Sequence, residues 1–447
     1  MKIRLVFLSM SLLVFVAAGF AVPAQAGQVS FIRDAEIEGT IRAYATLLFE
    51  GAGLDASAID IHIVNDKRLN AFVAGGRRLF LNTGLLMAAE NPNQLIGVIA
   101  HESGHIAGGH LARTHDAMRN ASAASILSYV LGAAAVVAGS PEALIPLLLG
   151  GEVLARGKFL AYSRAQEQSA DQFATGVLDY TGQSSRGLAE FLHLLEGQEV
   201  LLASRQDPYL RSHPLTRERV NFVSNHAANS PFADAATPEE QLVAFARMKA
   251  KLMGFLNPRD ALKAYPDSDT SLAARYARAI AYYLRPNLDR ALGEIDSLLV
   301  EHPNDGYFHE LKGQILFENG HIDEAVLSYA YAVALLPDEP LIRGGLAQAM
   351  IETGNLQTFN AAVEHLEAAL RQDRELPGAW RLLSIAYGRT DRLGLSWLAS
   401  AEHAMLIGRP KDAVSFAKRA GDMLPTGAPG QLRAQDIEFV AQQALKK

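Results

Sequence analysis

A spacing of 34 residues recurs through the C-terminal half of this chain, and no other feature of the sequence constrains the fold as much. In the clearest unit, small residues, an aromatic residue and a proline occupy fixed positions. Neighbouring units repeat several of these positions in register, which an unspecific helical bundle does not readily produce. The markers of the clearest unit are Gly313, Gly320, Ala325, Tyr329, Ala332 and Pro337.

This period is typical of tetratricopeptide repeats, in which each unit is a pair of helices joined by a turn. Small side chains recur because paired helices approach closely, and proline recurs where each hairpin ends. We therefore expect an α-solenoid over residues 236–447, with a concave face that binds partner segments. Flanking units carry the markers Ala279, Ala291, Pro303, Ala347, Gly354, Ala362, Ala369, Ala401, Gly408, Ala413, Ala417, Ala420 and Pro425.

A His-Glu-Ser-Gly-His motif that begins at His101 indicates metal chemistry in the N-terminal half. Apolar residues around it repeat at helical spacing, Asn91 offers an N-cap and Pro92 a first-turn residue. Residues i and i+4 share one helix face, so His101 and His105 can hold one metal ion. Glu102 then lies close enough to take a proton from water on the metal. Zinc suits these ligands, and we predict one Zn²⁺ per chain.

Glu167 is the best candidate for a third ligand. It lies four residues before Asp171 at the start of a second predicted helix, so both carboxylates face the same way. One can bind the metal while the other accepts the remaining N–H of a ligating histidine. The alternative is a solvated helix face with ordinary ion pairs.

Taken together, the motifs resemble those of the gluzincin metallopeptidases of the HtpX and CAAX prenyl endopeptidase type. They come in the order of that family and span roughly residues 30–230. The zinc-helix motif and the Glu-x-x-x-Asp motif are preceded by a strand and turn, and followed by a His-Pro motif. The segments are Asn70-Ala71-Phe72, Gly75-Gly76, Thr83-Gly84-Leu85-Leu86, His101-Glu102-x-x-His105, Ser163-Arg164-x-x-Glu167-x-x-x-Asp171, and Ser212-His213-Pro214 with Arg219.

The resemblance implies a role for each matching position. His101, His105 and Glu167 would bind zinc, and Glu102 would be the general base. Asp171 would orient a ligand.

The His-Pro motif implies a further role near the metal for His213, with Arg219 as a supporting residue. One alternative is that His213 caps the zinc and holds the enzyme latent, which leaves no position for the attacking water. Another is that it donates to the developing oxyanion. The third is a turn histidine before Pro214 without a role in catalysis.

Three other histidines are not expected to bind the metal. His110 and His115 follow His105 at intervals of five, which drift off the metal-binding face of a continuous helix. His62 alternates with three isoleucines in a probable strand.

The strand near residues 77–82 is predicted to form the edge beside the cleft and to accept substrate as an added strand. Arg78, Phe80 and Asn82 would lie on one of its faces and contact the substrate.

The first 26 residues read as a signal peptide. Lys2 and Arg4 precede an apolar run, and Ala24-Gln25-Ala26 fits a cleavage site. An uncleaved anchor is the alternative, because the run is close to the minimum that spans a bilayer. The chain contains no cysteine, which excludes a lipoprotein anchor and disulfides.

Residues 121–150 carry only one charged side chain, Glu142, and Gly139-Ser140-Pro141 divides the run. Three interpretations remain open: a helical hairpin over the active site, a contact with a membrane surface, and a transmembrane pair.

The expected fold is mainly α with a small β-sheet: a metallopeptidase domain over residues 27–235, followed by the repeats. Few contacts should cross that boundary. The net charge of −7 and the absence of Lys or Arg runs give no case for nucleic acid.

A secreted zinc peptidase joined to such repeats is similar to the β-barrel assembly-enhancing protease family. The resemblance implies a periplasmic enzyme whose partners are unfolded or misassembled outer-membrane proteins and the β-barrel assembly machinery. Association with a membrane surface through residues 121–150 is one of the three interpretations of that segment. The alternative function is a latent or non-proteolytic scaffold, against which Glu102 speaks, because a scaffold needs no base beside zinc.

Overall fold

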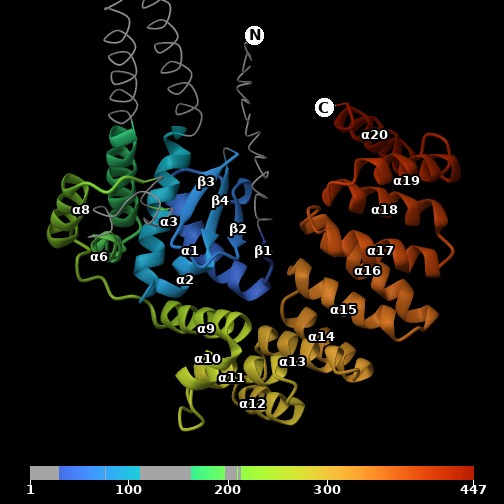
Figure 1. Ribbon diagram of the computed structural model, residues 1–447, viewed down its shortest axis with the longest axis horizontal. Helices are drawn as coiled ribbons and strands as arrows, with labels where there is room; N and C mark the ends of the chain where they lie inside the picture. The colour runs from blue at the N-terminus through green and yellow to red at the C-terminus, as the bar shows by residue number, and fades with distance from the viewer. Residues whose placement is uncertain (1–29, 76, 111–162, 197–208, 210–212, 447) are drawn as a thin grey trace, which may run out of the picture.

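The structure is a computed structural model that describes residues 30–75, 77–110, 163–196, 209 and 213–446 (Figure 1). The predicted signal peptide (1–26) and the apolar run (121–150) lie outside the described residues. Within the described part of the chain, no helix has the length and apolar character needed to cross a membrane.

A four-stranded sheet with the order β1-β2-β4-β3 organises the N-terminal half. Its central strands β2 and β4 are parallel, and β1 and β3 pair antiparallel on the two outer sides. The predicted edge position of residues 77–82 is therefore wrong, because β4 has a neighbour on each side and β3 forms the edge. The strands are β1 (Phe31–Ile32), β2 (Asp60–Val64), β3 (Ala71–Ala74) and β4 (Arg78–Asn82).

The two faces of this sheet differ in character. Alternate residues such as Ile63 and Leu79 point inward and are fully buried in the core. The opposite face carries an aromatic row in which Phe80 stacks between His62 and Phe72, with ring centroids 4.8 Å apart in both pairs. The sheet is thus covered by helices on one face and turns aromatic rings outward on the other.

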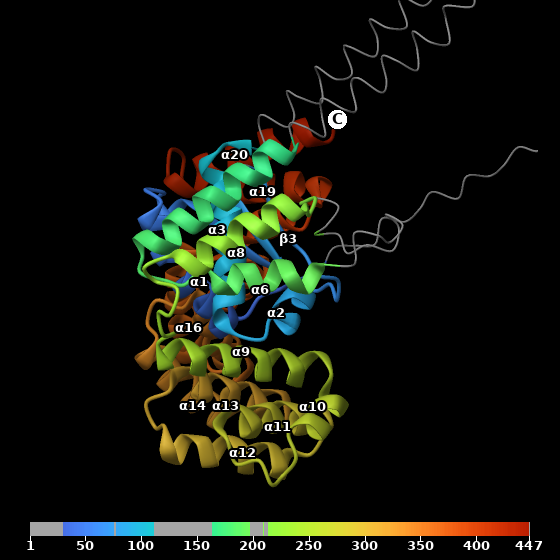
Figure 2. The same cartoon turned by 90° about the vertical axis from the view of Figure 1, so that its left-hand side faces the viewer.

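Helices pack on the inner face of the sheet, and α3 lies in the middle of these helices (Figure 2). Asn91 caps α3 by accepting a hydrogen bond from the Gln94 backbone N–H, and Pro92 is its first residue, as predicted. Residues 163–180 form a further helix. The labelled helices are α1 (Ala35–Gly51), α2 (Thr83–Ala88), α3 (Pro92–Ala107), α6 (Arg186–Leu195) and α8 (Arg217–Asn229), with a short 3-10 turn at Ala56–Ala58.

Glycines let these helices cross closely. A Cβ on Gly104 would lie 2.9 Å from the Cα of Ala170, where α3 meets the helix of residues 163–180. A Cβ on Gly97 would similarly lie 2.8 Å from the backbone of Leu188 in α6. The first crossing brings the two helices that carry the predicted ligands into direct contact.

The C-terminal half is a series of helices in which each packs on the next, and the predicted mainly α fold with a small sheet and helical repeats is confirmed. A Cβ on Gly313 would lie 2.9 Å from the ring of Tyr329, which explains a small residue at that repeat position. The helices are α9 (Glu239–Leu256), α10 (Pro258–Ala264), α11 (Leu272–Leu284), α12 (Leu288–Glu301), α13 (Gly306–Glu318), α14 (Ile322–Leu335), α15 (Pro340–Glu352), α16 (Leu356–Gln372), α17 (Pro377–Arg389), α18 (Leu393–Leu406), α19 (Pro410–Met423) and α20 (Pro429–Ala444).

A buried ionic cluster joins the two halves. Lys251 Nζ in α9 lies 2.8 Å from Asp34 Oδ2, 3.3 Å from Glu36 Oε2 and 3.4 Å from Glu310 Oε2 of α13. Burial disfavours the charged amine, but the surrounding carboxylates, Asp34 first, hold the pKa of Lys251 well above its ordinary value. Arg247 bridges Glu36 (2.6 Å) and, in the repeats, Asp305, 2.5 Å away. The sequence did not predict that such a cluster crosses the boundary.

The repeats curve back toward the outer face of the sheet (Figure 1). Arg33 Nη2 next to β1 lies 2.9 Å from Asp373 Oδ2 after α16. A cleft of about 800 Å³ lies between the sheet and the repeats. Phe31, His62 and Phe80 line it on the side of the sheet. Pro340, the first residue of α15, lines the cleft on the side of the repeats.

Candidate metal centre

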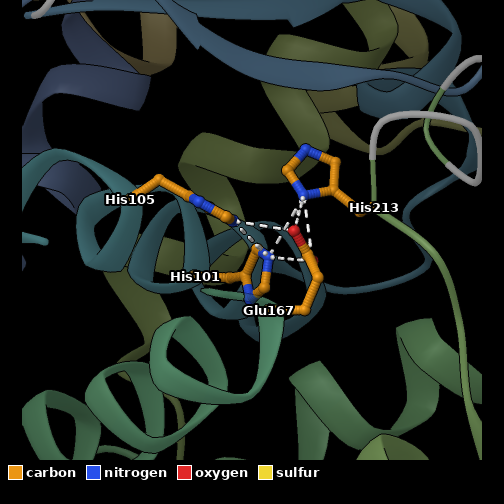
Figure 3. A group of neighbouring side chains, drawn as sticks. All are labelled: His101, His105, Glu167 and His213. Carbon is orange, nitrogen blue, oxygen red and sulfur yellow. Dashed lines mark hydrogen bonds and ion pairs between the residues drawn. The ribbon is translucent and has the colours of Figure 1, made fainter. Parts of the chain in front are cut away.

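Four side chains from three segments converge on one point (Figure 3). His101 and His105 come from adjacent turns of α3, Glu167 from the neighbouring helix, and His213 from the segment before α8. One ligand atom of each lies within 4.8 Å of the others. The structure thus brings together all three predicted ligands and His213.

Five of the six distances between the ligand residues are close to those expected around a zinc ion. His101 Nε2 lies 3.2 Å from His105 Nε2 and 3.4 Å from His213 Nδ1. Glu167 oxygens lie 3.3 Å from His101 Nε2, 3.4 Å from His105 Nε2 and 3.1 Å from His213 Nδ1. Zinc with bonds of about 2.0–2.1 Å places tetrahedral ligand atoms about 3.3 Å apart. The donor set and its spacing therefore fit zinc.

The predicted orienting residue Asp171 lies behind His101. Its Oδ1 is 2.9 Å from His101 Nδ1, the ring nitrogen that faces away from the cluster. Arg219 donates to both oxygens of Asp171, from Nε at 2.7 Å and Nη2 at 2.9 Å. Its Nη1 also lies 3.0 Å from Glu167 Oε2 and donates to the Pro214 carbonyl at 3.0 Å. One guanidinium thus connects both acidic side chains with the His-Pro segment.

Glu102 is buried beside the cluster. Its two carboxylate oxygens have no hydrogen-bond partner among the described residues, although Oε1 lies 3.4 Å from His213 Nε2. A buried carboxylate without partners is costly. Burial accordingly raises the pKa of Glu102 above its usual value. A nearby cation and a water molecule would relieve that cost, which is a second observation that fits a metal.

The charges of the cluster are strongly coupled. Burial disfavours protonation of His101, but hydrogen bonds to Asp171 and Glu167 outweigh it and raise its pKa to about 9. Burial and the neighbouring imidazoles lower the pKa of His105 to about 2. Burial favours neutral Glu167, yet His213 and His101 hold its pKa well below the ordinary value. Glu167 is therefore held as a carboxylate and His105 as a neutral imidazole, and both of these forms can bind a metal ion.

Tyr209 is a residue of the site that sequence reasoning missed. Its ring stacks on His213 with centroids 4.6 Å apart and packs edge-on against Phe191. Its carbonyl accepts the His213 backbone N–H at 2.7 Å, and its own N–H donates to Leu69. No motif in the sequence singled out this tyrosine, because its role depends on contacts with distant segments.

Three further histidines, His62, His110 and His115, were not expected to bind the metal. His62 lies in the aromatic row of the sheet and not in the cluster. His115 is outside the described residues. His110 is not part of the cluster either, but it is buried against His105, with the two Nδ1 atoms 3.0 Å apart. The sequence did not predict this contact.

The predicted substrate contacts do not lie at the cluster. Arg78 and Phe80 face the cleft toward the repeats, on the sheet face away from α3. Asn82 is buried and donates from Nδ2 to the Arg68 carbonyl. These residues share a strand, as expected, but a central strand cannot pair with a substrate, so their assignment as contacts of an added strand is wrong.

Comparison with known proteins agrees with this site. Residues 32–227 match the family model of peptidase family M48. The beta-barrel assembly-enhancing protease of Escherichia coli O157:H7 is 26% identical over 418 residues, which cover 91% of this chain and 83% of that protein. Its counterpart in Yersinia pestis is 24% identical and covers 93% of this chain and 85% of that protein. Matches of this length include the helical repeats as well as the peptidase part.

A shorter relative matches a smaller part of the chain. The metalloprotease LoiP of Escherichia coli (strain K12) is 28% identical over 175 residues, which cover 39% of this chain and 64% of that protein.

We predict that Arg219 is essential for the stability of the ligand arrangement. Arg219→Met should lower the free energy of unfolding by about 3–5 kcal/mol, because it leaves two buried carboxylates without their cation. Arg217→Met, exposed in the same helical turn, is the matched control and should change it by less than about 0.5 kcal/mol. Denaturant titration of metal-free protein, followed by circular dichroism, measures both. Equal stability of the two variants would contradict the prediction.

Proposed function

From the premise that residues 32–227 are a peptidase domain of family M48, we propose that this protein is a periplasmic zinc metalloendopeptidase. It acts in the assembly and quality control of outer-membrane β-barrel proteins. The observation that carries the proposal is the convergence of His101, His105, Glu167 and His213 on one point, with the buried base Glu102 beside them.

In this proposal His101, His105 and Glu167 hold one zinc ion, and Asp171 and Arg219 fix their orientation. Bound zinc acts as a Lewis acid and lowers the pKa of a water molecule in its shell to about 7. Glu102 takes the proton of the attacking water and passes it to the leaving amine of the substrate. Burial raises the pKa of Glu102, which makes its carboxylate a stronger base for that transfer.

Substrate is proposed to pair with β3, the edge strand next to α3. The Asn82 N–H donates to the Asn70 carbonyl, so hydrogen-bonded pairs alternate from there and Phe72 pairs with Phe80. The N–H and C=O groups of Ala71 and Val73 then point away from β4. Backbone pairing at this edge gives affinity with little sequence preference, which suits a protease that acts on many unfolded clients.

The closed arrangement is proposed to be a latent state. A catalytic zinc keeps a position open for water, whereas His213 completes a four-ligand shell. Departure of His213 would open that position. The Tyr209 ring stacked on His213 favours the closed state.

The repeats are proposed to dock clients and the assembly machinery. The relatives that match nine-tenths of this chain are named for β-barrel assembly. Residues 1–26 would be a signal peptide, with the peptidase domain ending near residue 235 and the repeats following.

A second candidate is a scaffold with a silent metal site, which the closed zinc shell alone would favour. Against it stands Glu102, whose buried carboxylate has no structural partner among the described residues.

We predict that Glu102→Gln keeps one zinc per chain but loses hydrolysis by about 10² to 10⁴-fold, since a general base contributes that much. Metal analysis and cleavage of an unfolded protein measure the two properties. His105→Ala is the control and should lose the zinc itself. Activity of Glu102→Gln within tenfold of the unmodified protein, or full zinc in His105→Ala, would contradict the assignment.

Val73→Pro tests the edge strand. Proline removes an N–H that points away from β4, so the sheet stays paired while a substrate loses one hydrogen bond. We expect kcat/KM for an unstructured peptide to fall roughly 3- to 10-fold, the worth of one such bond. Val73→Thr keeps the N–H and should leave kcat/KM unchanged. If both variants cleave equally well, substrate binds elsewhere.

His213→Ala separates latency from transition-state stabilisation. If His213 caps the metal, its removal opens the water position and raises proteolysis, while zinc stays bound through three ligands. If it donates to the oxyanion, the rate falls by about 10² to 10³-fold. We expect a rise, visible as self-cleavage or faster loss of an unfolded substrate. A fall in rate at full zinc occupancy would refute the latent state.

A further inference from the structure

His110 contacts one of the proposed zinc ligands from behind. It is only 5% exposed, and its ring meets the ring of His105 edge-on with centroids 5.0 Å apart. The two Nδ1 atoms are 3.0 Å from each other, which is a hydrogen-bond distance. His105 Nε2 faces the opposite way, toward His101 and Glu167.

The local backbone is built for this contact. Helix α3 ends at Ala107, and Gly109 adopts a left-handed conformation with φ +60° that interrupts the helix before His110. The ring of His110 folds over Gly108 so closely that a Cβ there would lie 2.3 Å from His110 Nε2. Gln166, the residue before Glu167, donates from Nε2 to the His110 carbonyl at 3.1 Å. The turn is thus tied directly to the helix that carries the third ligand.

The position of the proton follows from the ligand geometry. A cation on His105 Nε2 leaves the proton of the neutral ring on Nδ1. That N–H needs an acceptor, because metal-ligating histidines almost always donate their second ring N–H to a partner. His110 Nδ1 lies where the acceptor must be, and its ring then carries its own proton on Nε2.

The pair matches the arrangement at His101. There the acceptor for Nδ1 is Asp171, whose charge is balanced by Arg219. For His105 the corresponding group is the His110 imidazole, which is not a carboxylate and so brings no negative charge of its own beside Glu167 and Glu102.

We propose that His110 is a positioning residue that accepts the Nδ1–H of His105 and thereby fixes that ligand for the metal. This inference rests on the proposed zinc site. It agrees with the expectation that His110 does not bind the metal, and it adds an orienting role that the sequence did not predict. The role is that of an orienting acceptor and not of a fifth ligand.

Four proteins test the proposal: the full-length chain and its variants His110→Asn, His110→Gln and His110→Leu. Asparagine can place an amide oxygen where Nδ1 lies, whereas glutamine extends its amide toward the position of Nε2. Leucine fills a similar volume to asparagine without an acceptor. The zinc dissociation constant is measured by competition with a chromogenic chelator, and cobalt-substituted protein reports ligand geometry through its visible absorption.

We expect His110→Leu and His110→Gln to weaken zinc binding by about 10- to 100-fold, the usual cost of losing such a partner. His110→Asn should stay within about threefold of the unmodified chain and keep its cobalt spectrum. The melting temperatures of the metal-free proteins should be alike for Asn and Gln, which keeps the comparison valid if the Leu variant does not fold.

Two outcomes would overturn the inference alone. If His110→Gln binds zinc as tightly as the unmodified chain, no orienting bond is needed. If Asn and Gln weaken binding equally, His110 acts by packing. If the unmodified chain itself retains no zinc, the proposed function fails along with the inference.

Discussion

The ion pair between Arg219 and Asp171 is the interaction on which the arrangement of the site depends. It is buried, it joins α8 to the helix of residues 163–180, and through Asp171 it reaches the ring of His101. The same guanidinium touches Glu167 and the Pro214 carbonyl. Removing any one member would leave an uncompensated charge in the interior, which costs about 3–5 kcal/mol. The ligands are therefore held by a network in which the loss of any single member destabilises the folded protein.

Close helix packing is the second requirement, and the sequence carried a visible sign of it. Gly104 lies inside the His-Glu-Ser-Gly-His motif, where a larger residue would force α3 away from Ala170. The periodicity and capping signals of α3 are local, so they could be predicted from the sequence. The i, i+4 pairs at His101 and His105, and at Glu167 and Asp171, follow from helix geometry alone. That is why the ligand set could be proposed before the fold was known.

Errors arose where the structure depends on breaks in regular geometry or on distant neighbours. The interval of five residues correctly kept His110 out of the ligand set, but it was judged on an uninterrupted helix and missed the contact with His105. The helix ends at Ala107, and Gly109 adopts a left-handed conformation. Alternation along Arg78–Asn82 predicts which residues share a face, but it contains no information on which strands lie beside it. Strand order is a non-local property, and β3 turned out to be the edge.

The boundary between the two halves shows the same limit. The 34-residue period predicts a self-contained solenoid, yet Lys251 in α9 pairs with Asp34 and Glu36 of the N-terminal half as well as with Glu310 in the repeats. No local pattern connects residues so far apart. The consequence is that the repeats do not hang from a linker. They are held by buried charges with their inner side toward the aromatic face of the sheet.

A client protein would meet two separate surfaces, one at the cleft beside the repeats and one at the metal cluster. The cleft between Phe80 and the repeats lies on the outer face of the sheet, whereas the cluster of His101 and His105 lies beyond its inner face. Within the described sheet, β3 adjoins both, because its open edge lies next to α3 and its Phe72 belongs to the aromatic row. A segment that pairs with β3 can therefore extend from the docking side to the metal side. In the proposed latent state His213 would close the metal side. Arg219 donates to the Pro214 carbonyl and to Asp171, not to the His213 ring, so departure of that ring would not require the pair of Arg219 with Asp171 to break.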